Sequence, residues 1–247
     1  DLVSTSSVDT LRWKPGSDIT VDSLQFHRTR YAQKFVFDEL RWSRIWPCLQ
    51  WVEEEQQRHG RRLTVLDVGC GDGSVSRLFL EAGHRVCGVD IVPELVQKAI
   101  EKDIEAKAAD IAKDGLPFAN KEMDIVYAGA LIEHLYDPES FLKECYRVLK
   151  EEGIVVLSTP NVASLTSRLR TLCGKGPKFY TSALSWEFGG HIRIFTSRTL
   201  KYLLEENGFV VEEITSNLVS LLPSRKTRRP WSVRLAKWMP SLGEVLI

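Results

Sequence analysis

Short apolar runs alternate with amphipathic stretches through the middle of the chain. Each apolar run predicts a buried strand, and these strands lie at residues 63–68, 85–90, 105–109, 124–128 and 154–158. The third of them, at 105–109, is the weakest prediction. Helices are predicted in the amphipathic stretches between them, where apolar residues recur every three or four positions. Continuously apolar strands that alternate with helices are typical of a parallel sheet covered on both faces. The pattern therefore predicts a doubly wound α/β fold.

The N-terminal region follows a different pattern. Residues 1–20 are polar and weakly patterned, which predicts an extended arm. Residues 21–59 carry apolar residues at helical spacing, and Pro47 is expected to divide them into two helices. This part of the chain is therefore not expected to contribute strands to the sheet.

The C-terminal region departs from the alternation of parallel strands and helices. A helix is predicted at residues 196–207, followed by a strand at 209–214. Residues 245–247 begin a further apolar strand. We expect that strand to run antiparallel, inserted between the fifth and sixth strands.

Composition narrows the class of protein. The chain of 247 residues has 33 Lys and Arg and 33 Asp and Glu, so its formal net charge is zero. This balance argues against a dedicated nucleic-acid-binding protein, which would show a basic excess. The five cysteines are widely spaced and include no Cys-x-x-Cys pair, which favours reduced thiols in a cytoplasmic protein over a zinc site or disulfides. No apolar run approaches the roughly 20 residues of a membrane span.

The first predicted strand ends in a glycine-rich turn. The strand runs into Asp67, three glycines then alternate at positions 69, 71 and 73, and a helix begins near Ser74. Glycines let the backbone approach a ligand closely, and a helix N-terminus presents N–H groups. The next strand ends at Asp90, where a carboxylate is placed to accept the two ribose hydroxyls of a nucleoside.

The spacing and charge of this turn favour one nucleoside. Dinucleotide-binding turns have the spacing Gly-x-Gly-x-x-Gly, whereas this turn has Gly-x-Gly-x-Gly. Asp67 precedes the turn and Asp72 lies inside it, and carboxylates there would repel a pyrophosphate. They suit a ligand that carries an ammonium and a sulfonium, as S-adenosylmethionine (SAM) does.

These segments resemble the successive motifs of class I SAM-dependent methyltransferases. The motifs are Asp67–Gly73, Gly88–Asp90, Ala109–Ile111 and the segment 124–134. The resemblance implies a Rossmann-like, mostly parallel, seven-stranded sheet in the order 3-2-1-4-5-7-6, with strand 7 antiparallel. It also implies that SAM is bound by Asp67, Gly69, Cys70, Gly71, Gly73, Asp90, Ile91, Asp110, Ile111, Ala128 and Leu131.

Three further segments are similar to particular groups within that family. They are Ile132–His134, Ser158–Asn161 and Gly190–Phe195, which resemble quinone O-methyltransferases, glycan-modifying methyltransferases and the methionine-biosynthesis protein W group. The resemblance implies a SAM-binding domain at residues 61–247, with residues 1–60 capping the active site. It also implies an insertion that shapes the acceptor pocket at about residues 161–195.

Two histidines are candidate catalytic residues. His134 follows the fourth strand, and His191 lies in a glycine-containing loop. We expect both to face the methyl-transfer site, one of them acting as a general base, because a neutral imidazole is available near neutral pH. Some small-RNA methyltransferases hold a divalent metal with Glu-x-x-Glu-His and a later His. Ala130 stands at the first Glu position here, so no metal is expected.

The expected activity is transfer of a methyl group from SAM to an oxygen of a small-molecule, glycan or lipid-linked acceptor. Two alternatives remain open at this point: a non-catalytic SAM-fold protein that binds a partner enzyme, and an RNA methyltransferase. A basic stretch with two tryptophans at residues 224–239 predicts peripheral contact with an anionic membrane. The protein is therefore expected in the cytoplasm, with this stretch as its membrane-facing surface.

Overall fold

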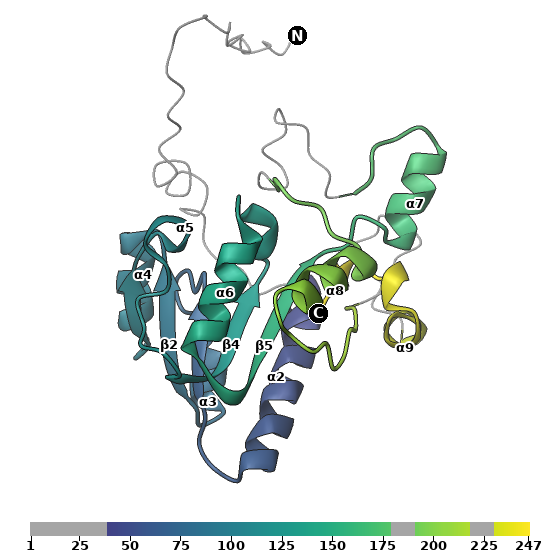
Figure 1. Ribbon diagram of the computed structural model, residues 1–247. Helices are drawn as coiled ribbons and strands as arrows, with labels where there is room; N and C mark the ends of the chain where they lie inside the picture. The colour runs from purple at the N-terminus through teal and green to yellow at the C-terminus, as the bar shows by residue number, and fades with distance from the viewer. Residues whose placement is uncertain (1–38, 179–190, 218–229) are drawn as a thin grey trace, which may run out of the picture.

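The computed structural model describes residues 39–178, 191–217 and 230–247. The described strands form one six-stranded sheet in the order β3-β2-β1-β4-β5-β6 (Figure 1). Strands β1 to β5 run parallel, and β6 runs antiparallel to β5. The strand bounds are Thr64–Val68 (β1), Arg85–Asp90 (β2), Glu105–Ala108 (β3), Met123–Gly129 (β4), Leu149–Pro160 (β5) and Val245–Leu246 (β6). The predicted doubly wound α/β fold is confirmed.

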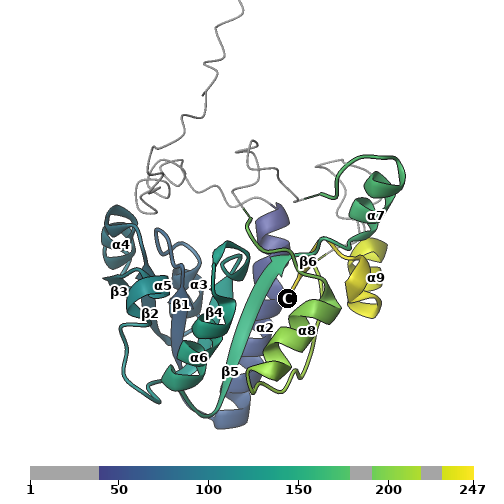
Figure 2. The ribbon, with the colours of Figure 1, turned by 45° about the horizontal axis from the view of Figure 1, so that its top comes forward.

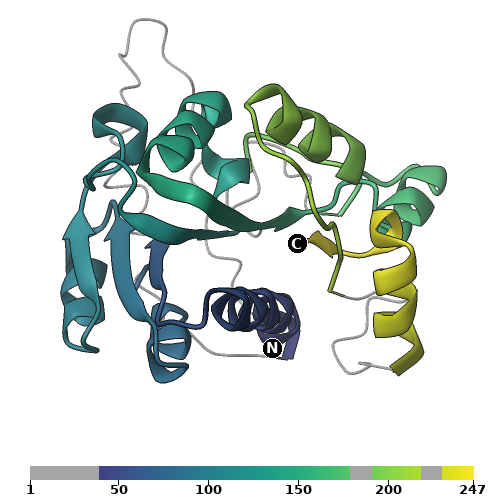
Figure 3. The ribbon, with the colours of Figure 1, turned by 60° about the horizontal axis from the view of Figure 1, so that its bottom comes forward.

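Helices cover both faces of the sheet. Figure 3 shows α2 and α3 on one face and α6 and α8 on the other. The α-helices are Glu39–His59 (α2), Ser76–Glu81 (α3), Pro93–Ile100 (α4), Ile111–Asp114 (α5), Pro138–Val148 (α6), Leu165–Leu172 (α7), Ser197–Glu206 (α8) and Pro230–Trp238 (α9). Two short 3-10 helices are Ile132–His134 (η1) and Pro240–Leu242 (η3).

The alternation of side chains along β1 divides the core in two. Leu66 and Val68 pack with the buried residues of α6 and α8. Val65, on the opposite face of the strand, packs with Cys48 of α2 and Phe79 of α3. Both faces are buried, and Asp67 is the one charged residue of the strand, so its carboxylate needs a specific partner.

Helix α2 is continuous through Pro47, so the predicted division into two helices is wrong. A proline inside a helix removes one N–H donor and crowds the preceding turn. Ile45, Cys48 and Val52 on the same helix are each at most 2% exposed, and their burial holds the helix together across the proline. The predicted arm at residues 1–20 lies outside the described residues.

The sheet has six described strands instead of seven, because residues 209–214 do not form the predicted strand. Strand β6 takes the place expected for strand 7: Leu246 pairs with Thr159 of β5, and Ile247 exchanges two backbone hydrogen bonds of 3.0 Å with Thr215. With only Val245 and Leu246 in the strand, the pairing stops at Thr215 and does not reach residues 209–214.

An open groove of about 1080 Å³ lies between β5 and residues 208–214, next to α2 and α8. None of the predicted site residues lines it; they come from the carboxyl ends of the parallel strands and the loops that follow, where ligands bind in such folds. No helix in the described parts of the chain is long and apolar enough to cross a membrane.

Candidate active site

The glycine turn after β1 has a backbone that only glycine adopts easily. The φ angles of Gly69, Gly71 and Gly73 are +77°, +54° and +75°, in the left-handed region. The N–H groups of Gly69 and Cys70 both donate to the carbonyl oxygen of Val89, at 2.8 and 3.1 Å. The turn is therefore fastened to the end of β2, which places it beside Asp90.

Two glycines of the turn each allow close contact with a different part of the chain. A Cβ on Gly73 would lie 2.9 Å from Cα of Ala99, so Gly73 allows α4 to pack against the turn. A Cβ on Gly69 would lie 3.3 Å from Cδ1 of Leu131, which follows β4. The turn thus touches the segment after β4, where a cofactor and an acceptor would meet in such a fold.

Asp90 organises the turn through both of its carboxylate oxygens. Oδ2 accepts the N–H of Gly71 and Oδ1 accepts the N–H of Val92, each at 2.9 Å. A carboxylate can accept several hydrogen bonds, including those from the hydroxyls of a ribose. Asp90 is half-buried, which keeps it accessible to a ligand.

Asp67 is the buried acid of the site. It is 2% exposed, and the hydroxyl of Ser76 donates to its Oδ2 at 2.6 Å. Burial raises the pKa of Asp67 to about 7; the Ser76 hydrogen bond opposes this rise, and the negative charge of Asp90 adds to it. A cationic ligand nearby would favour the ionised form, which fits the ammonium and sulfonium of SAM.

Asp72 does not supply the negative charge that the sequence argument assigned to it. Nζ of Lys102 lies 2.8 Å from Oδ2 of Asp72 and also donates to Oγ of Ser74. Partial burial acts to raise the pKa of Asp72, but the hydrogen bonds from Lys102 and Ser74 outweigh it and lower the pKa. Its charge is balanced by Lys102, so Asp67 and Asp90 remain as the acids of the site.

Two predicted cofactor residues have side chains directed into the core. The thiol of Cys70 packs against Gly88, where an added Cβ would lie 2.9 Å from Sγ. Ala128 is fully buried in the core below the end of β4. Each can therefore meet a ligand only through its backbone.

The remaining predicted cofactor residues surround the turn at the strand ends. Asp110 caps α5, its Oδ1 accepting the N–H of Ala112 at 3.2 Å. Ile111 and Leu131 are half-buried and pack against the core, and Ile91 is half-buried directly after Asp90. They are placed at the same edge of the sheet as Asp90.

The two candidate catalytic histidines are brought together by backbone hydrogen bonds. His134 ends the 3-10 helix η1, and its N–H donates to the carbonyl oxygen of Leu131 at 2.9 Å. The N–H groups of Ile192 and Arg193 both donate to the carbonyl oxygen of Glu133 at 3.0 Å. These bonds dock the segment that begins at His191 onto η1.

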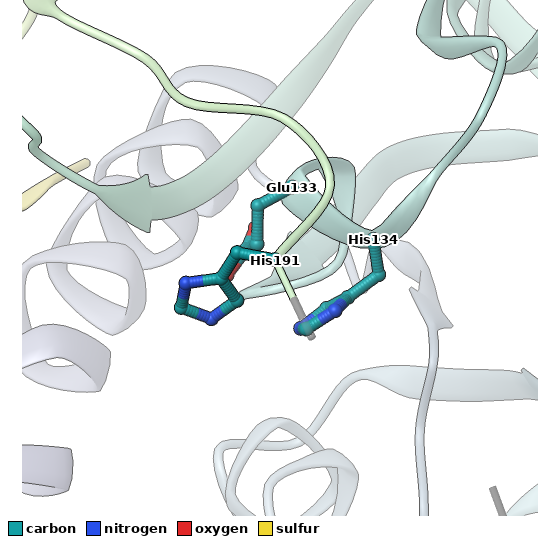
Figure 4. Close-up of side chains that lie close together, drawn as sticks. All are labelled: Glu133, His134 and His191. Atoms are coloured by element: carbon teal, nitrogen blue, oxygen red, sulfur yellow. The ribbon is translucent and has the colours of Figure 1, made fainter. Parts of the chain in front are cut away.

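As a result, the rings of His134 and His191 lie side by side, with centroids 4.9 Å apart (Figure 4). Both side chains are half-buried. Residues 179–190, which include the two glycines before His191, lie outside the described residues. The structure thus brings the predicted pair together beside the segment that contacts the glycine turn.

Glu133, which directly precedes His134, was not included among the predicted site residues. Its side chain is 1% exposed, lies beside the two histidines (Figure 4), and accepts the hydroxyl of Thr159 through Oε2 at 3.1 Å. One ligand atom from each of Glu133, His134 and His191 lies within 4.8 Å of the others. The signal in the sequence was its place directly before His134 at the end of a buried strand.

The motif Ser158–Asn161 has a structural role at the end of β5. Nδ2 of Asn161 donates to the carbonyl oxygens of Ser241 and Gly243, at 3.0 and 2.8 Å, and its Oδ1 accepts the N–H of Ala163. Asn161 is fully buried. It holds the segment that leads into β6 against the end of β5.

The chain matches the family model described as a methyltransferase domain over residues 33–214. It is 30% identical over 151 residues to a probable S-adenosylmethionine-dependent methyltransferase of Mycolicibacterium smegmatis, covering 60% of this chain and 52% of that protein. It is 28% identical over 173 residues to the mitochondrial ubiquinone biosynthesis O-methyltransferase of Bos taurus, covering 63% of this chain and 44% of that protein. The chain thus spans about half the length of these curated relatives.

A solved structure has the same fold. The SAM-dependent methyltransferase of Archaeoglobus fulgidus superposes with a TM-score of 0.54 at 22% identity, covering 80% of this chain and 91% of that one. The match to the family model covers more than half of the chain and includes the glycine turn, Asp90 and η1. The chain therefore belongs to the methyltransferase domain family, in the class I group whose methyl donor is SAM.

Proposed function

We propose that this chain methylates a hydroxyl oxygen of a small-molecule, glycan or lipid-linked acceptor. The observation that carries the proposal is the cluster of Glu133, His134 and His191 next to the glycine turn. A hydroxyl must lose its proton as the new bond to carbon forms, and groups that accept a proton accelerate such steps by roughly 10²–10⁴-fold. This cluster supplies such groups at the edge of the sheet where the acceptor must lie.

The glycine turn and the two histidines are connected through a single residue, Leu131. Leu131 packs against Gly69, and the carbonyl oxygen of Leu131 accepts the N–H of His134. The glycine turn and the 3-10 helix η1 are therefore adjoining parts of one candidate site. An acceptor held between them would have its oxygen within reach of a cofactor bound on the turn.

SAM supplies a methyl group on a positively charged sulfur, so the chain itself needs to bind, orient and deprotonate. Asp90 is assigned to the ribose hydroxyls, because its carboxylate fixes the glycine turn and is half-buried at the end of β2, where a ligand can reach it. Asp67 is assigned to the positive end of the cofactor. His134 or His191 is assigned as the base that takes the acceptor proton.

The names of the curated relatives indicate which acceptors to test first. Proteins from Bos taurus and Pseudomonas entomophila are named as ubiquinone biosynthesis O-methyltransferases. The name places those proteins in ubiquinone biosynthesis and describes transfer of a methyl group to oxygen. Phenols and quinols are therefore the first class to offer this chain, followed by sugars and lipid-linked glycans.

The test is transfer of label from SAM. The purified chain is incubated with labelled SAM and each acceptor class, and with fractions of cell extract, and label transfer is measured. With an acceptor in hand, kcat is followed against pH for His134→Gln and His191→Gln, with His59→Gln on α2 as the matched control. The base variant should lose roughly 10²–10⁴-fold together with the acidic limb. Near-normal rates and profiles in both variants would contradict a histidine base.

We also propose peripheral contact between residues 224–239 and an anionic membrane surface. In the described part of this segment, Trp238 is 87% exposed and Arg234 and Lys237 are exposed. Figure 2 shows α7 at the same end of the molecule as α9, and both helices contact η3. Leu172 of α7 is 84% exposed, so apolar and basic side chains occur together at this end.

A further inference from the structure

Glu133 is the buried carboxylate beside the two candidate bases. Its side chain is 1% exposed, whereas His134 and His191 are half-buried. One carboxylate oxygen and one imidazole nitrogen from each histidine lie within 4.8 Å of one another, and Figure 4 shows the carboxylate next to the rings. An acceptor can therefore touch a histidine, whereas Glu133 can act on the reaction only through the histidines.

We propose that Glu133 is the positioning residue of the histidine base. Its carboxylate holds an imidazole of the pair His134 and His191 in place and stabilises the imidazolium that forms when this imidazole takes the acceptor proton. The catalytic part of the proposal rests on the proposed function, since it concerns the same base. The electrostatic part concerns the chain alone: a negative charge at Glu133 increases the proton affinity of the histidine pair.

The carboxylate is fixed in direction before any ligand binds. The hydroxyl of Thr159, a fully buried residue at the end of β5, donates to Oε2 of Glu133 at 3.1 Å. The backbone of Glu133 also fixes His191, because its carbonyl oxygen accepts the N–H groups of Ile192 and Arg193. A charge that is already in place costs no reorganisation when the reaction occurs.

Other buried acids of the described chain show what such a carboxylate requires. A buried charge is costly unless it is paired, and three further acids that are at most 5% exposed each pair with a cationic side chain. Beside Glu133 lie two imidazoles, either of which becomes a cation when it takes a proton. The three comparison pairs are Glu55 with Arg58, Asp124 with Lys150 and Glu244 with Lys178, at 3.2, 3.0 and 3.1 Å.

The arrangement suits the uptake of one proton. An opposite charge within about 4–6 Å favours the protonated imidazole, and a like charge disfavours it, each by about 1–3 pH units. The carboxylate therefore promotes the first protonation of the pair. The rings of His134 and His191 have centroids 4.9 Å apart, so a first imidazolium opposes a second one. Methylation of one hydroxyl releases one proton, which matches this capacity.

The remaining charges around the cluster leave this role to Glu133. In η1 and residues 191–195 the other charged side chain is Arg193, which is exposed and donates to the carbonyl oxygen of Tyr136. Residues 127–131 and 157–160, at the ends of β4 and β5, include no charged residue. The acids of the glycine turn act in the same direction as Glu133, and a comparison of variants at position 133 alone cancels their effect.

During methyl transfer a positive charge moves from the sulfur to the base. The acceptor proton passes to an imidazole nitrogen as the acceptor oxygen forms its bond to the methyl carbon. The bond between that carbon and sulfur breaks, and its electron pair stays on sulfur as a neutral thioether. The charge of the sulfonium is lost and an imidazolium appears beside Glu133. The fixed carboxylate stabilises the base in the state that it reaches as the proton is transferred.

The first test needs no acceptor. Histidine ring signals of the full chain are titrated by NMR, and His134→Gln and His191→Gln assign the signals. Glu133→Gln has the same shape and still accepts the Thr159 hydroxyl, so it removes mainly the charge. The higher of the two titration midpoints should fall by about one pH unit or more in Glu133→Gln.

The matched control is a second buried carboxylate next to a histidine. Glu55 on α2 lies 3.0 Å from Nε2 of His59, outside the candidate site. Glu55→Gln should lower the midpoint of His59 and leave those of His134 and His191 unchanged. Circular dichroism and SAM binding check that each variant is folded with an intact cofactor site.

The second test uses an acceptor once one is known. Glu133→Gln should lower kcat by about tenfold or more, leave the KM for SAM unchanged and move the acidic limb of the kcat profile to lower pH. Glu133→Asp keeps the charge on a shorter side chain, so it should restore the limb and only part of kcat. If Glu133→Gln does not fold, Thr159→Val tests the positioning: kcat should fall at constant KM for SAM, and an unchanged kcat would count against the proposal.

The outcomes separate this proposal from the proposed function. Equal midpoints in the wild-type and folded Glu133→Gln chains, or an acidic limb that does not move, would overturn the role of Glu133 and leave the histidine base standing. Near-normal rates and profiles in both His134→Gln and His191→Gln would instead overturn the base, and with it the catalytic part of this proposal, whatever the midpoints are.

Discussion

Replacement of Asp90 by alanine should weaken SAM binding at least tenfold while the chain stays folded. The carboxylate accepts the N–H groups of Gly71 and Val92 and is assigned to the ribose hydroxyls. Alanine leaves all of these donors without their acceptor. Because Asp90 is half-buried, water can replace its carboxylate as the acceptor for the two backbone N–H groups. The substitution should therefore reduce SAM affinity more than it reduces the stability of the chain.

The magnitude follows from the strength of hydrogen bonds to charged groups. Each contributes about 1.5–3 kcal/mol net, and about 1.4 kcal/mol corresponds to a factor of ten in affinity. Loss of a single ribose contact therefore predicts a decrease of roughly 10- to 150-fold. Relaxation of the turn around Gly71 would add to this loss, because the same carboxylate positions its backbone.

The assay is calorimetric titration with SAM, accompanied by thermal unfolding. Asp90→Asn keeps one acceptor oxygen and should give an intermediate affinity. Asp137→Asn is the matched control, because Asp137 likewise accepts a backbone N–H, that of Ser140 at the start of α6, and is not among the residues assigned to SAM. Wild-type affinity in a folded Asp90→Ala chain would refute the ribose assignment. An unfolded variant would shift the test to Asp90→Asn.

Three further predictions concern other parts of the molecule. Gly71→Val should abolish SAM binding and lower the apo Tm, because a β-branched residue is strained at a φ of +54°. Gly73→Val should lower the apo Tm further, because it is strained in the same way and its Cβ would also lie 2.9 Å from the α4 backbone; equal Tm values for the two variants would contradict this order. Since the folded-state pKa of Asp67 is raised to about 7, stability should fall as pH rises from about 4 to 7, and Asp67→Asn should flatten that slope in chemical denaturation. Trp238→Ala with Arg234→Glu should reduce sedimentation with anionic vesicles but not with neutral ones; unchanged sedimentation would argue against the membrane contact.

Most of the sheet was predictable because its strands are buried on both faces. The apolar runs at β1, β2, β4 and β5 have that appearance in the sequence, and parallel pairing follows from the helices between them. The prediction of the weaker strand β3 was also correct, although the side chains of this strand are largely exposed. It pairs through its backbone with β2, and backbone pairing at an edge needs little apolar surface.

The errors share a physical cause, which is the influence of distant parts of the chain. Pro47 lies within one helix because the core on either side of it outweighs a lost hydrogen bond. Residues 209–214 have the composition of a strand, but a strand exists only where a neighbour pairs with it. The charge of Asp72 is balanced by Lys102, which lies thirty residues further along the chain, in the turn after α4.

The candidate site was predictable to the extent that it is formed by strand ends. Asp67, the glycines and Asp90 come from two adjacent parallel strands, so their proximity follows from the fold. The meeting of His134 with His191 does not follow from the fold in this way. It depends on two backbone hydrogen bonds to one carbonyl oxygen, for which side-chain identity gives no signal.

That carbonyl oxygen belongs to Glu133, so one residue joins the two halves of the site. Its backbone holds the segment of His191, and its side chain lies buried beside the two histidines, one of which is proposed as the base. Leu131, which directly precedes η1, packs against Gly69 of the glycine turn. A shift of the segment that begins at His191 would therefore move this histidine relative to both His134 and the glycine turn. The two hydrogen bonds to the Glu133 carbonyl oxygen thus link the position of that segment directly to assembly of the proposed catalytic cluster.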